Sequence, residues 1–417
     1  MRTLDRRTFL SWAGAVGVLA GLPLARRARA DAFEGPYVLT LHASGGWDPT
    51  LLCDPKGRAS EDEEDPVNTY LTDDIEQVGP FLVAPLDGHR AFFERFRSQL
   101  LVINGVDTQT NSHEVGERFT WSGRMDPDSP ALSALAAGLS PVRPSLGFLS
   151  NGGYDLTGGL VAPTRLGDTR TILELAYPDR LSETDPASTL LPAATLQRVA
   201  DARVTRLDRQ IDAATLPRVQ RAWGLLREAR LGDNELAALA DVLPSNLDSG
   251  SDLRRQAQVA MACFAAGVTV SANLTIGGFD THGDHDTAHG AAMRSLVDGL
   301  TFAMNEAERL GIADKVIVVV GSDFGRTPWY NDGAGKDHWS ITSMMLMGPG
   351  IRGGRVVGGT THYQEPRTVD PSTGALDDAG VRVTPADVHA DLRRLLGVAD
   401  RPELARWGVG REMGLLA

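Results

Sequence analysis

The chain has 417 residues, of which 42% are hydrophobic and 23% are charged, and its formal net charge is −13. This composition is typical of a globular protein and excludes a low-complexity or disordered chain. The excess of acidic residues opposes binding to nucleic acid and to anionic lipid, because both carry the same sign of charge. We therefore expect neither as a partner.

The first 30 residues have the pattern of an export signal. A pair of arginines at positions 6–7 precedes an apolar run over 12–24, and the sequence ARA at 28–30 has the small-x-small form of a cleavage site. The apolar run is shorter than the roughly 20 residues that span a membrane. The paired arginines indicate the twin-arginine route. We therefore expect a periplasmic or secreted mature protein, with the twin-arginine translocation machinery as its partner during export; a basic cytoplasmic tail is the alternative.

Residues 31–417 read as an α/β domain. Continuous apolar runs at 37–43, 99–106, 268–276, 315–322 and 340–348 predict strands, and helical patterns fall at 88–98 and at about 289–310. Strands that are apolar on both faces and joined by helices are typical of a mostly parallel sheet with helices on both faces. This fold class is our prediction for the chain.

The stretch from about 191 to 267 is charged, helical in period and free of strand patterns, which predicts an inserted helical subdomain. The acidic run SEDEEDP at 60–66 is expected to be a solvated loop. Only two cysteines are present, Cys53 and Cys263. They allow one disulfide in an oxidising compartment or two buried thiols, and the sequence leaves both open.

Polar residues follow the predicted strands at their carboxyl ends, where sites form in parallel sheets. Carboxylate and imidazole together are the ligands of zinc or manganese. A single residue of this kind is commonly a loop polar group, but five at successive strand ends predict a metal site. The candidate ligands are Asp48, Asp280, His282, Asp323 and His338.

The order of these residues makes the chain recognisable. An Asp after the first strand, a hydroxyl residue after the next, Asp-x-His, and then an Asp followed by a later His resembles the alkaline-phosphatase-like superfamily of alkaline phosphatases, sulfatases and phosphoglycerate mutases. The segments GGFDTHG, GSDFGRTP and DHW also resemble the exported bacterial family known as domain of unknown function 1501.

The resemblance implies one or two divalent metal ions, zinc or manganese. Asp280, His282 and His338 would hold one ion, and Asp48 and Asp323 would serve a second position or bridge the two. A pair of ions clamps the attacking and leaving oxygens of an in-line displacement.

The resemblance also implies a hydroxyl nucleophile at a helix N-terminus after the second strand, where Ser112 and Thr110 lie. The helix amides there favour a bound phosphate. Ser112 is equally suited to cap the helix, and its neighbour His113 is a candidate ligand, a phosphate donor or a surface residue. Arg326 suits anion binding, with pairing to Asp323 as the alternative.

The positions of three other histidines in the predicted elements indicate their roles. His285 and His289 lie four apart on one predicted helix face and are candidates for spare ligands or for holding ligands in place. His42 lies inside a predicted strand and is read as structural.

Two departures from the superfamily pattern matter. Where the phosphatases carry Asp-His, this chain has Asp323-Phe324, so one ligand of the second metal is missing. The segment CDPKGR at 53–58 is close to the sulfatase motif, but Gly57 stands in the place of its arginine, and the segment follows the first strand and not the second, which argues against a sulfatase. The export signal, the candidate ligands and the resemblance together predict an exported metal-dependent hydrolase of phosphate or sulfate esters, acting on a small or polymer-linked anionic ester. The alternative is a non-catalytic exported binding or envelope-assembly protein that keeps the fold.

The export signal gives the first test. Replacing Arg6 and Arg7 together with Lys should leave the precursor in the cytoplasm, because the translocation machinery reads the paired arginines. Cell fractionation and the mass of the processed N-terminus measure the result. Efficient export of the double variant, with cleavage near Ala30, would contradict the twin-arginine assignment.

Overall fold

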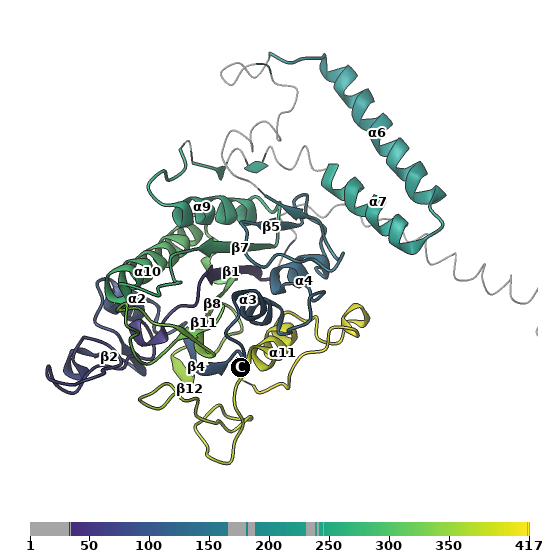
Figure 1. Ribbon diagram of the computed structural model, residues 1–417. Helices are drawn as coiled ribbons and strands as arrows, with labels where there is room; N and C mark the ends of the chain where they lie inside the picture. Colours follow the sequence, from purple (N-terminus) through teal and green to yellow (C-terminus); the bar gives the residue numbers. More distant parts are fainter. Residues whose placement is uncertain are drawn as a thin grey trace, which may run out of the picture.

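The computed structural model describes residues 33, 35–165, 181, 188–230, 238–239, 242–244, 246–414 and 416. The predicted export signal at 1–30 therefore lies outside the described residues. The centre of the fold is an eight-stranded sheet with the order β12-β4-β11-β8-β1-β7-β5-β6 (Figure 1). All neighbouring strands in it are parallel except β11, which runs antiparallel to β4 and β8. The predicted fold class is confirmed.

The bounds of the elements follow. The strands of the large sheet are β1 (Tyr37–Ala43), β4 (Leu101–Asp107), β5 (Phe148–Ser150), β6 (Pro163–Thr164), β7 (Ser271–Ile276), β8 (Val316–Ser322), β11 (Ile341–Met347) and β12 (Arg355–Gly358). Two small sheets pair β2 (Glu76–Val78) with β3 (Phe81–Val83) and β9 (Gly325–Arg326) with β10 (His338–Trp339). The helices are α2 (His89–Phe96), α3 (His113–Ser122), α4 (Leu132–Gly138), α6 (Ala193–Ala213), α7 (Pro217–Arg230), α9 (Asp252–Ala265), α10 (His285–Arg309) and α11 (Pro385–Leu395).

The central strands are buried on both faces because alternate side chains enter different cores. In β1, Leu39 and Leu41 join the larger core, whereas Val38 joins the core on the other side. In β8 the same division separates Val318 from Ile317. The continuous apolar runs that predicted these strands are therefore explained by two hydrophobic layers.

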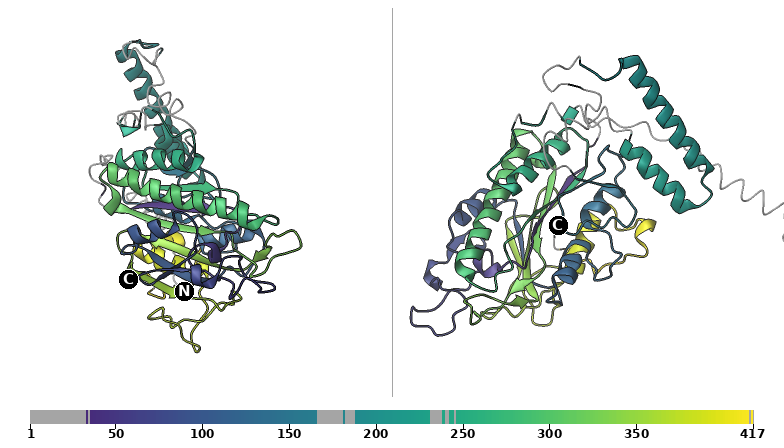
Figure 2. Two further views of the ribbon diagram at one scale, coloured as in Figure 1. Left: turned by 90° about the vertical axis from the view of Figure 1, so that its left-hand side faces the viewer. Right: turned by 45° about the horizontal axis from the view of Figure 1, so that its top comes forward.

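Helices α2, α9 and α10 cover one face of the sheet, and α3, α4 and α11 cover the other (Figures 1 and 2). The side chains of α9 and α10 lie in the same core cluster as β1, β7 and β8. Trp121 of α3 and Val388 of α11 lie in the opposite cluster. The sheet thus forms the middle of three layers, and loops at its edges remain free to carry a site.

Three described helices fall in the predicted insertion at 191–267. Helices α6 and α7 pair with each other and stand away from the body in both figures. Only Leu207 of α6 is buried. Helix α9, by contrast, lies in the main core beside β7 and α10. The boundaries of an inserted subdomain stay a prediction.

Two local expectations can be compared with the structure. The acidic loop 60–66 is mostly exposed. Cys53 and Cys263 are both buried, free thiols, so the two are not bridged. Burial, aided by the neighbouring Asp54, raises the pKa of Cys53 to about 12, which keeps this thiol protonated and unreactive.

None of the helices in the described part of the chain combines the length and the apolar character needed to cross a bilayer.

Close packing of α3 on the end of β8 depends on Gly116. A Cβ atom at this position would lie 2.3 Å from the backbone oxygen of Asp323, which no real contact tolerates. Gly116→Ala should therefore push α3 away from the sheet and destabilise the fold by about 1–3 kcal/mol.

Gly224 in the middle of α7 is the matched control. A Cβ there meets nothing within 4 Å, so Gly224→Ala should stabilise the protein by up to about 1 kcal/mol through helix propensity alone. Urea denaturation of both variants measures the difference. Equal effects in the two variants would contradict the close approach of α3 to β8.

Candidate metal centre

Three aspartates follow three neighbouring strands in the middle of the sheet. Asp48 follows β1, Asp280 follows β7 and Asp323 follows β8, and β1 lies between the other two strands. Because the three strands are parallel, their carboxyl ends share one edge of the sheet. The topology therefore brings together residues that are far apart in the chain, such as Trp47 and Ser322, which lie 275 positions apart and share a hydrogen bond.

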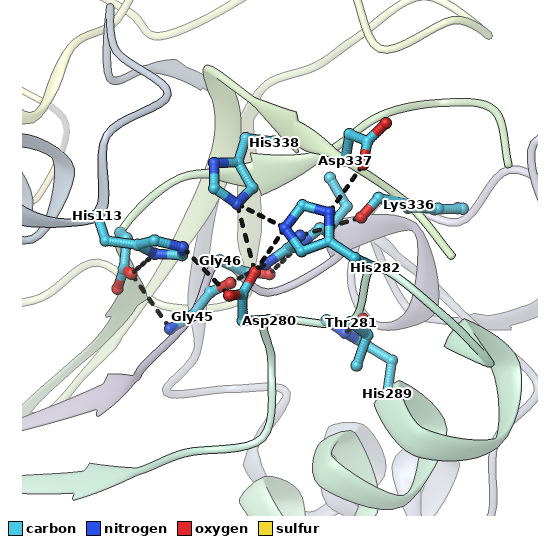
Figure 3. A network of polar contacts seen from close by, with 12 residues as sticks. Gly45, Gly46, His113, Asp280, Thr281, His282, His289, Lys336, Asp337 and His338 are labelled. Atoms are coloured by element: carbon cyan, nitrogen blue, oxygen red, sulfur yellow. Dashed lines mark hydrogen bonds and ion pairs between the residues drawn. The ribbon is translucent and has the colours of Figure 1, made fainter. Parts of the chain in front are cut away.

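Three imidazoles surround the Asp280 carboxylate (Figure 3). Its Oδ1 lies 3.0 Å from Nε2 of His282 and 3.3 Å from Nε2 of His338. Its Oδ2 lies 3.5 Å from Nε2 of His113. The Nε2 atoms of His282 and His338 are themselves 3.0 Å apart. These four side chains come from three separate segments of the chain, and we call them the Asp280 cluster.

Each imidazole is fixed from behind through its Nδ1 atom. Nδ1 of His338 donates to the backbone oxygen of Asn111 at 2.8 Å, and a carbonyl can only accept. Nδ1 of His282 contacts Oδ1 of Asp337 at 2.7 Å, and Nδ1 of His113 contacts Oδ2 of Asp323 at 2.6 Å.

Both of these carboxylates are ionised. The hydrogen bond from His282 lowers the pKa of Asp337. Burial alone would raise the pKa of Asp323, but its contacts with His42 and His113 outweigh burial and lower it. The two carboxylates therefore act as acceptors, and the proton lies on Nδ1 of each ring.

In the neutral form of an imidazole, a proton on Nδ1 leaves a lone pair on Nε2. In this form the Nε2 atoms of His282 and His338, 3.0 Å apart, face Oδ1 of Asp280 at 3.0 and 3.3 Å, and Nε2 of His113 faces Oδ2 at 3.5 Å, with no ring N–H to bridge them. Such a set repels itself unless a cation lies at its centre. Imidazoles oriented by carboxylates and carbonyls through the second nitrogen are typical of metal ligands. The donor set of the Asp280 cluster fits a zinc or manganese ion.

Arg326 holds Asp280 in place. The β9–β10 pairing sets Arg326 opposite His338, and Nη2 of Arg326 lies 2.6 Å from Oδ1 of Asp280. Its other hydrogen bonds go to backbone oxygens of Gly45, Gly46 and Lys336. Partial burial alone would raise the pKa of Asp280, but Arg326 outweighs it and lowers the pKa to about 2.

This arrangement corrects the predicted role of Arg326. Its side chain is fully buried and four of its five N–H donors are already used, so it is not free to clamp an anion from solvent. Nor does it pair with Asp323, the alternative considered from the sequence. It neutralises and orients the Asp280 carboxylate.

Asp323 lies behind the cluster rather than in it. Its Oδ1 lies 2.9 Å from Nε2 of His42, whose Nδ1 accepts the indole N–H of Trp121 at 2.7 Å. Its Oδ2 contacts His113. The sequence placed Asp323 as a ligand or bridge, and His42 as structural; the structure makes Asp323 the group that orients His113, with His42 as its second partner.

Phe324 fills the position where the superfamily pattern carries a second imidazole. Its ring is fully buried, and its centroid lies 4.7 Å from that of His113 and 4.5 Å from that of His338. The Phe324 ring therefore packs against two of the three cluster imidazoles and cannot itself bind a metal.

Asp48 is separated from the cluster by its own partners. Its Oδ1 accepts from the amide and the hydroxyl of Thr50, at 2.9 and 2.6 Å. Its Oδ2 accepts from Nζ of Lys336 at 2.7 Å and from Nε2 of His285 at 3.1 Å. Burial alone would raise the pKa of Asp48, but Lys336 and His285 hold it far below its ordinary value. The predicted role of Asp48 as a metal ligand is not supported by this geometry.

His285 and His289 belong to a closed ring of hydrogen bonds beneath the cluster. Burial lowers the pKa of both, so each is neutral and has one donor and one acceptor. The Asp48 amide donates to Nε2 of His289, Nδ1 of His289 donates to Thr281, Thr281 donates to Nδ1 of His285, and Nε2 of His285 donates back to Asp48. Thr281 lies between Asp280 and His282, so the ring fixes the loop that carries both.

The two candidate nucleophiles differ in their hydrogen bonds. Ser112 occupies the N-cap position of α3 but makes no capping hydrogen bond with its side chain, and it is exposed. It lies between Asn111, whose backbone oxygen accepts the hydrogen bond of His338, and His113, which belongs to the cluster. The hydroxyl of Thr110 instead accepts the amide of Ser112 at 3.1 Å and stabilises the turn. The geometry favours Ser112.

The cluster is open to solvent. The side chains of Asp280 and His282 are 48% and 47% exposed, and that of His113 is 39% exposed. A separate apolar hollow of about 420 Å³, lined in part by Phe33 and Val270, lies at the opposite edge of the sheet, where β1 begins. The residues that line this hollow include no carboxylate or imidazole, so it does not resemble the Asp280 cluster in chemistry.

Among the predicted ligands, the structure brings together Asp280, His282 and His338 and leaves Asp48 and Asp323 outside. Sequence reasoning left His113 open and missed Asp337 and Lys336. The signal for Asp337 was its place beside His338 in KDHW; Lys336 lies in the same segment, but only the fold shows its contact with Asp48.

One protein family matches the C-terminal part of the chain, which includes the KDHW segment. Residues 228–416 match the family described as a protein of unknown function, DUF1501. The resemblance seen in the sequence is confirmed over these residues. No curated protein matches the chain.

Solved structures similar to this chain are sulfatases and an alkaline phosphatase. The PsFucS1 sulfatase from Pseudoalteromonas sp. is 10% identical with a TM-score of 0.39, and the match covers 100% of this chain and 76% of that one. The 2-O GAG sulfatase BT1596 is 10% identical with a TM-score of 0.35, covering 89% and 73%. The alkaline phosphatase from the Antarctic bacterium TAB5 is 10% identical with a TM-score of 0.36, covering 88% and 99%.

The cluster geometry predicts that bound metal stabilises the fold. Asp280→Asn removes the carboxylate on which the imidazoles converge, so the purified variant should lose bound metal and should no longer lose stability on addition of a chelator. For the wild type, a metal present at a hundredfold excess over its Kd contributes about 2.7 kcal/mol. Elemental analysis and thermal denaturation, with and without chelator, measure this.

Asp284→Asn is the control. Asp284 is exposed, precedes α10 and makes no capping hydrogen bond with its side chain. Its replacement should leave metal content and chelator sensitivity unchanged. If the two variants keep the same metal content as the wild type, the cluster is not a metal site.

Proposed function

We propose that this protein is an exported metal-dependent hydrolase of phosphate or sulfate esters, with its metal held by the Asp280 cluster. The observation that supports the metal is the orientation of three imidazoles, each with Nδ1 held from behind and Nε2 directed at one carboxylate. When bound, a divalent cation would neutralise the charge of an ester oxyanion and favour the ionised form of a nearby hydroxyl.

The N-terminus of α3 is the proposed place of the ester group. Helix amides and the positive end of the helix dipole favour a phosphate or sulfate there. His113, the first residue of α3, belongs to the cluster, so an anion at the helix end would lie beside the cluster. Ser112 precedes it, and the hydroxyl of Ser112 makes no capping hydrogen bond.

The reaction proposed for Ser112 is attack on phosphorus or sulfur. The Oγ–H bond of Ser112 breaks and its proton passes to solvent as the new O–P or O–S bond forms. The ester O–P or O–S bond breaks, and the departing alkoxide takes a proton from solvent to give the free alcohol. Water then attacks the phosphorylated or sulfated Ser112, which releases inorganic phosphate or sulfate and restores the hydroxyl. Asp323 and Asp337 keep the Nε2 atoms of His113 and His282 aimed at the cluster throughout. Arg326 keeps Asp280 ionised, so that the ligand set carries one negative charge.

Zinc or manganese are the proposed ions, and export by the twin-arginine route is the proposed path to the periplasm or the medium. That route accepts folded proteins, which suits a chain whose proposed ligands come from three segments that meet only after folding. The substrate is proposed to be a small or polymer-linked anionic ester.

Substitution of Ser112 tests the proposal. Ser112→Ala should lower turnover of an aryl phosphate or aryl sulfate by roughly 10³-fold or more, while metal content and melting temperature stay at wild-type values. Wild-type turnover should rise with pH from acidic to neutral, because imidazoles bind a cation only when unprotonated and the hydroxyl must lose its proton to attack.

Thr110→Ala is the comparison, because Thr110 contributes a turn hydrogen bond and not the proposed nucleophile. It should retain most of the activity. A loss confined to Thr110→Ala would move the nucleophile two residues upstream. A metal-loaded wild type that hydrolyses no phosphate or sulfate ester in a broad panel would replace the hydrolase with an exported binding protein of the same fold.

A further inference from the structure

Lys336 and Asp48 form an ion pair that is closed to solvent. Both side chains are 0% exposed, and Nζ lies 2.7 Å from Oδ2 of Asp48. Nζ also donates to Oδ1 of Asn68 at 2.9 Å and lies 5.2 Å from the ring centroid of Tyr330. The three N–H bonds of the ammonium thus have a carboxylate, an amide oxygen and an aromatic face as partners.

The position of this ammonium is where a cation would be expected. Asp48 follows β1, the strand between those that lead to Asp280 and Asp323, and the sequence pattern assigned it to a second metal. An isolated carboxylate at this depth is strongly disfavoured, so a positive charge must accompany it. Nζ supplies one unit of charge at hydrogen-bond distance, where a divalent ion would supply two.

The same pair ties together the loops of the Asp280 cluster. The amide of Lys336 donates to the oxygen of Thr281 at 3.0 Å, and Thr281 lies between Asp280 and His282. Lys336 also lies two residues before His338. Asp48 is joined to Thr281 through His285 and His289.

We infer that Lys336 takes the place of a second metal ion beside Asp48, so that the protein binds a single ion at His113, Asp280, His282 and His338. Lys336 and Asp48 are then positioning residues that set the two ligand loops relative to each other. This inference rests on the proposed function and specifies its metal stoichiometry.

The test replaces the pair with neutral side chains of similar size, Asp48→Asn with Lys336→Met, because a single substitution would leave one buried charge unpaired and prevent folding. The full-length mature protein is loaded with zinc, and bound ions are counted after removal of excess metal. The wild type should hold one ion per chain, and the double variant should also hold one, with its Kd raised roughly 10- to 100-fold.

A second measurement separates positioning from plain stability. The visible absorption spectrum of the cobalt-substituted protein reports the arrangement of the ligands, and it should change in the double variant. The control is Asp298→Asn with Arg254→Met, which removes a pair of the same charges between α9 and α10. Its spectrum and affinity should match the wild type.

The outcomes are distinguishable from those of the proposed function. Two ions per wild-type chain, one of them lost from the Asp48/Lys336 double variant, would overturn the inference and leave the hydrolase intact. One ion per chain without any ester turnover would contradict the hydrolase and support the inference. An unchanged affinity and cobalt spectrum in the double variant would overturn the positioning role, and a wild type that binds no ion would overturn both proposals.

Discussion

The contact between Arg326 and Asp280 is the interaction on which the site depends. Arg326 is buried and held by backbone oxygens of the loop after β1 and of Lys336, so these contacts fix its guanidinium independently of Asp280. A fixed positive charge keeps Asp280 ionised and in one orientation. The three imidazoles then have a common target, and their Nε2 atoms come within 3.0 to 3.5 Å of it. Without Arg326 the carboxylate would be free to turn toward solvent.

Three aspartates at neighbouring strand ends have three different partners, and the partners decide their roles. Asp280 faces three imidazoles and an arginine; Asp323 holds His113 and contacts His42; Asp48 is neutralised by Lys336. Charge is therefore balanced separately at each strand end. Because each carboxylate is satisfied locally, the sheet edge accommodates three acidic groups without large mutual repulsion.

The strands and part of the cluster could be predicted from the sequence, but the partners of the polar side chains could not. The strands β1, β4, β7, β8 and β11 could be predicted because their buried faces on both sides leave continuous apolar runs. Asp280, His282 and His338 could be placed together because the order of these residues resembles the superfamily pattern, which assigns the three to one ion. Arg326 was expected to face an anion, and its burial beneath Asp280 was not visible, since no local pattern distinguishes a buried arginine from an exposed one.

The sequence by itself determined the parallel sheet, the edge at which the site lies and the residue types that form it, because hydrophobic period and strand ends are local properties of the chain. Only the tertiary structure decided which partner each polar side chain meets. The fourth cluster residue, His113, is selected by Asp323, 210 positions away, and Asp48 is removed from the ligand set by Lys336, 288 positions away. Such pairings arise when distant loops converge in three dimensions and compete for the same charge, and no spacing within the chain records the result.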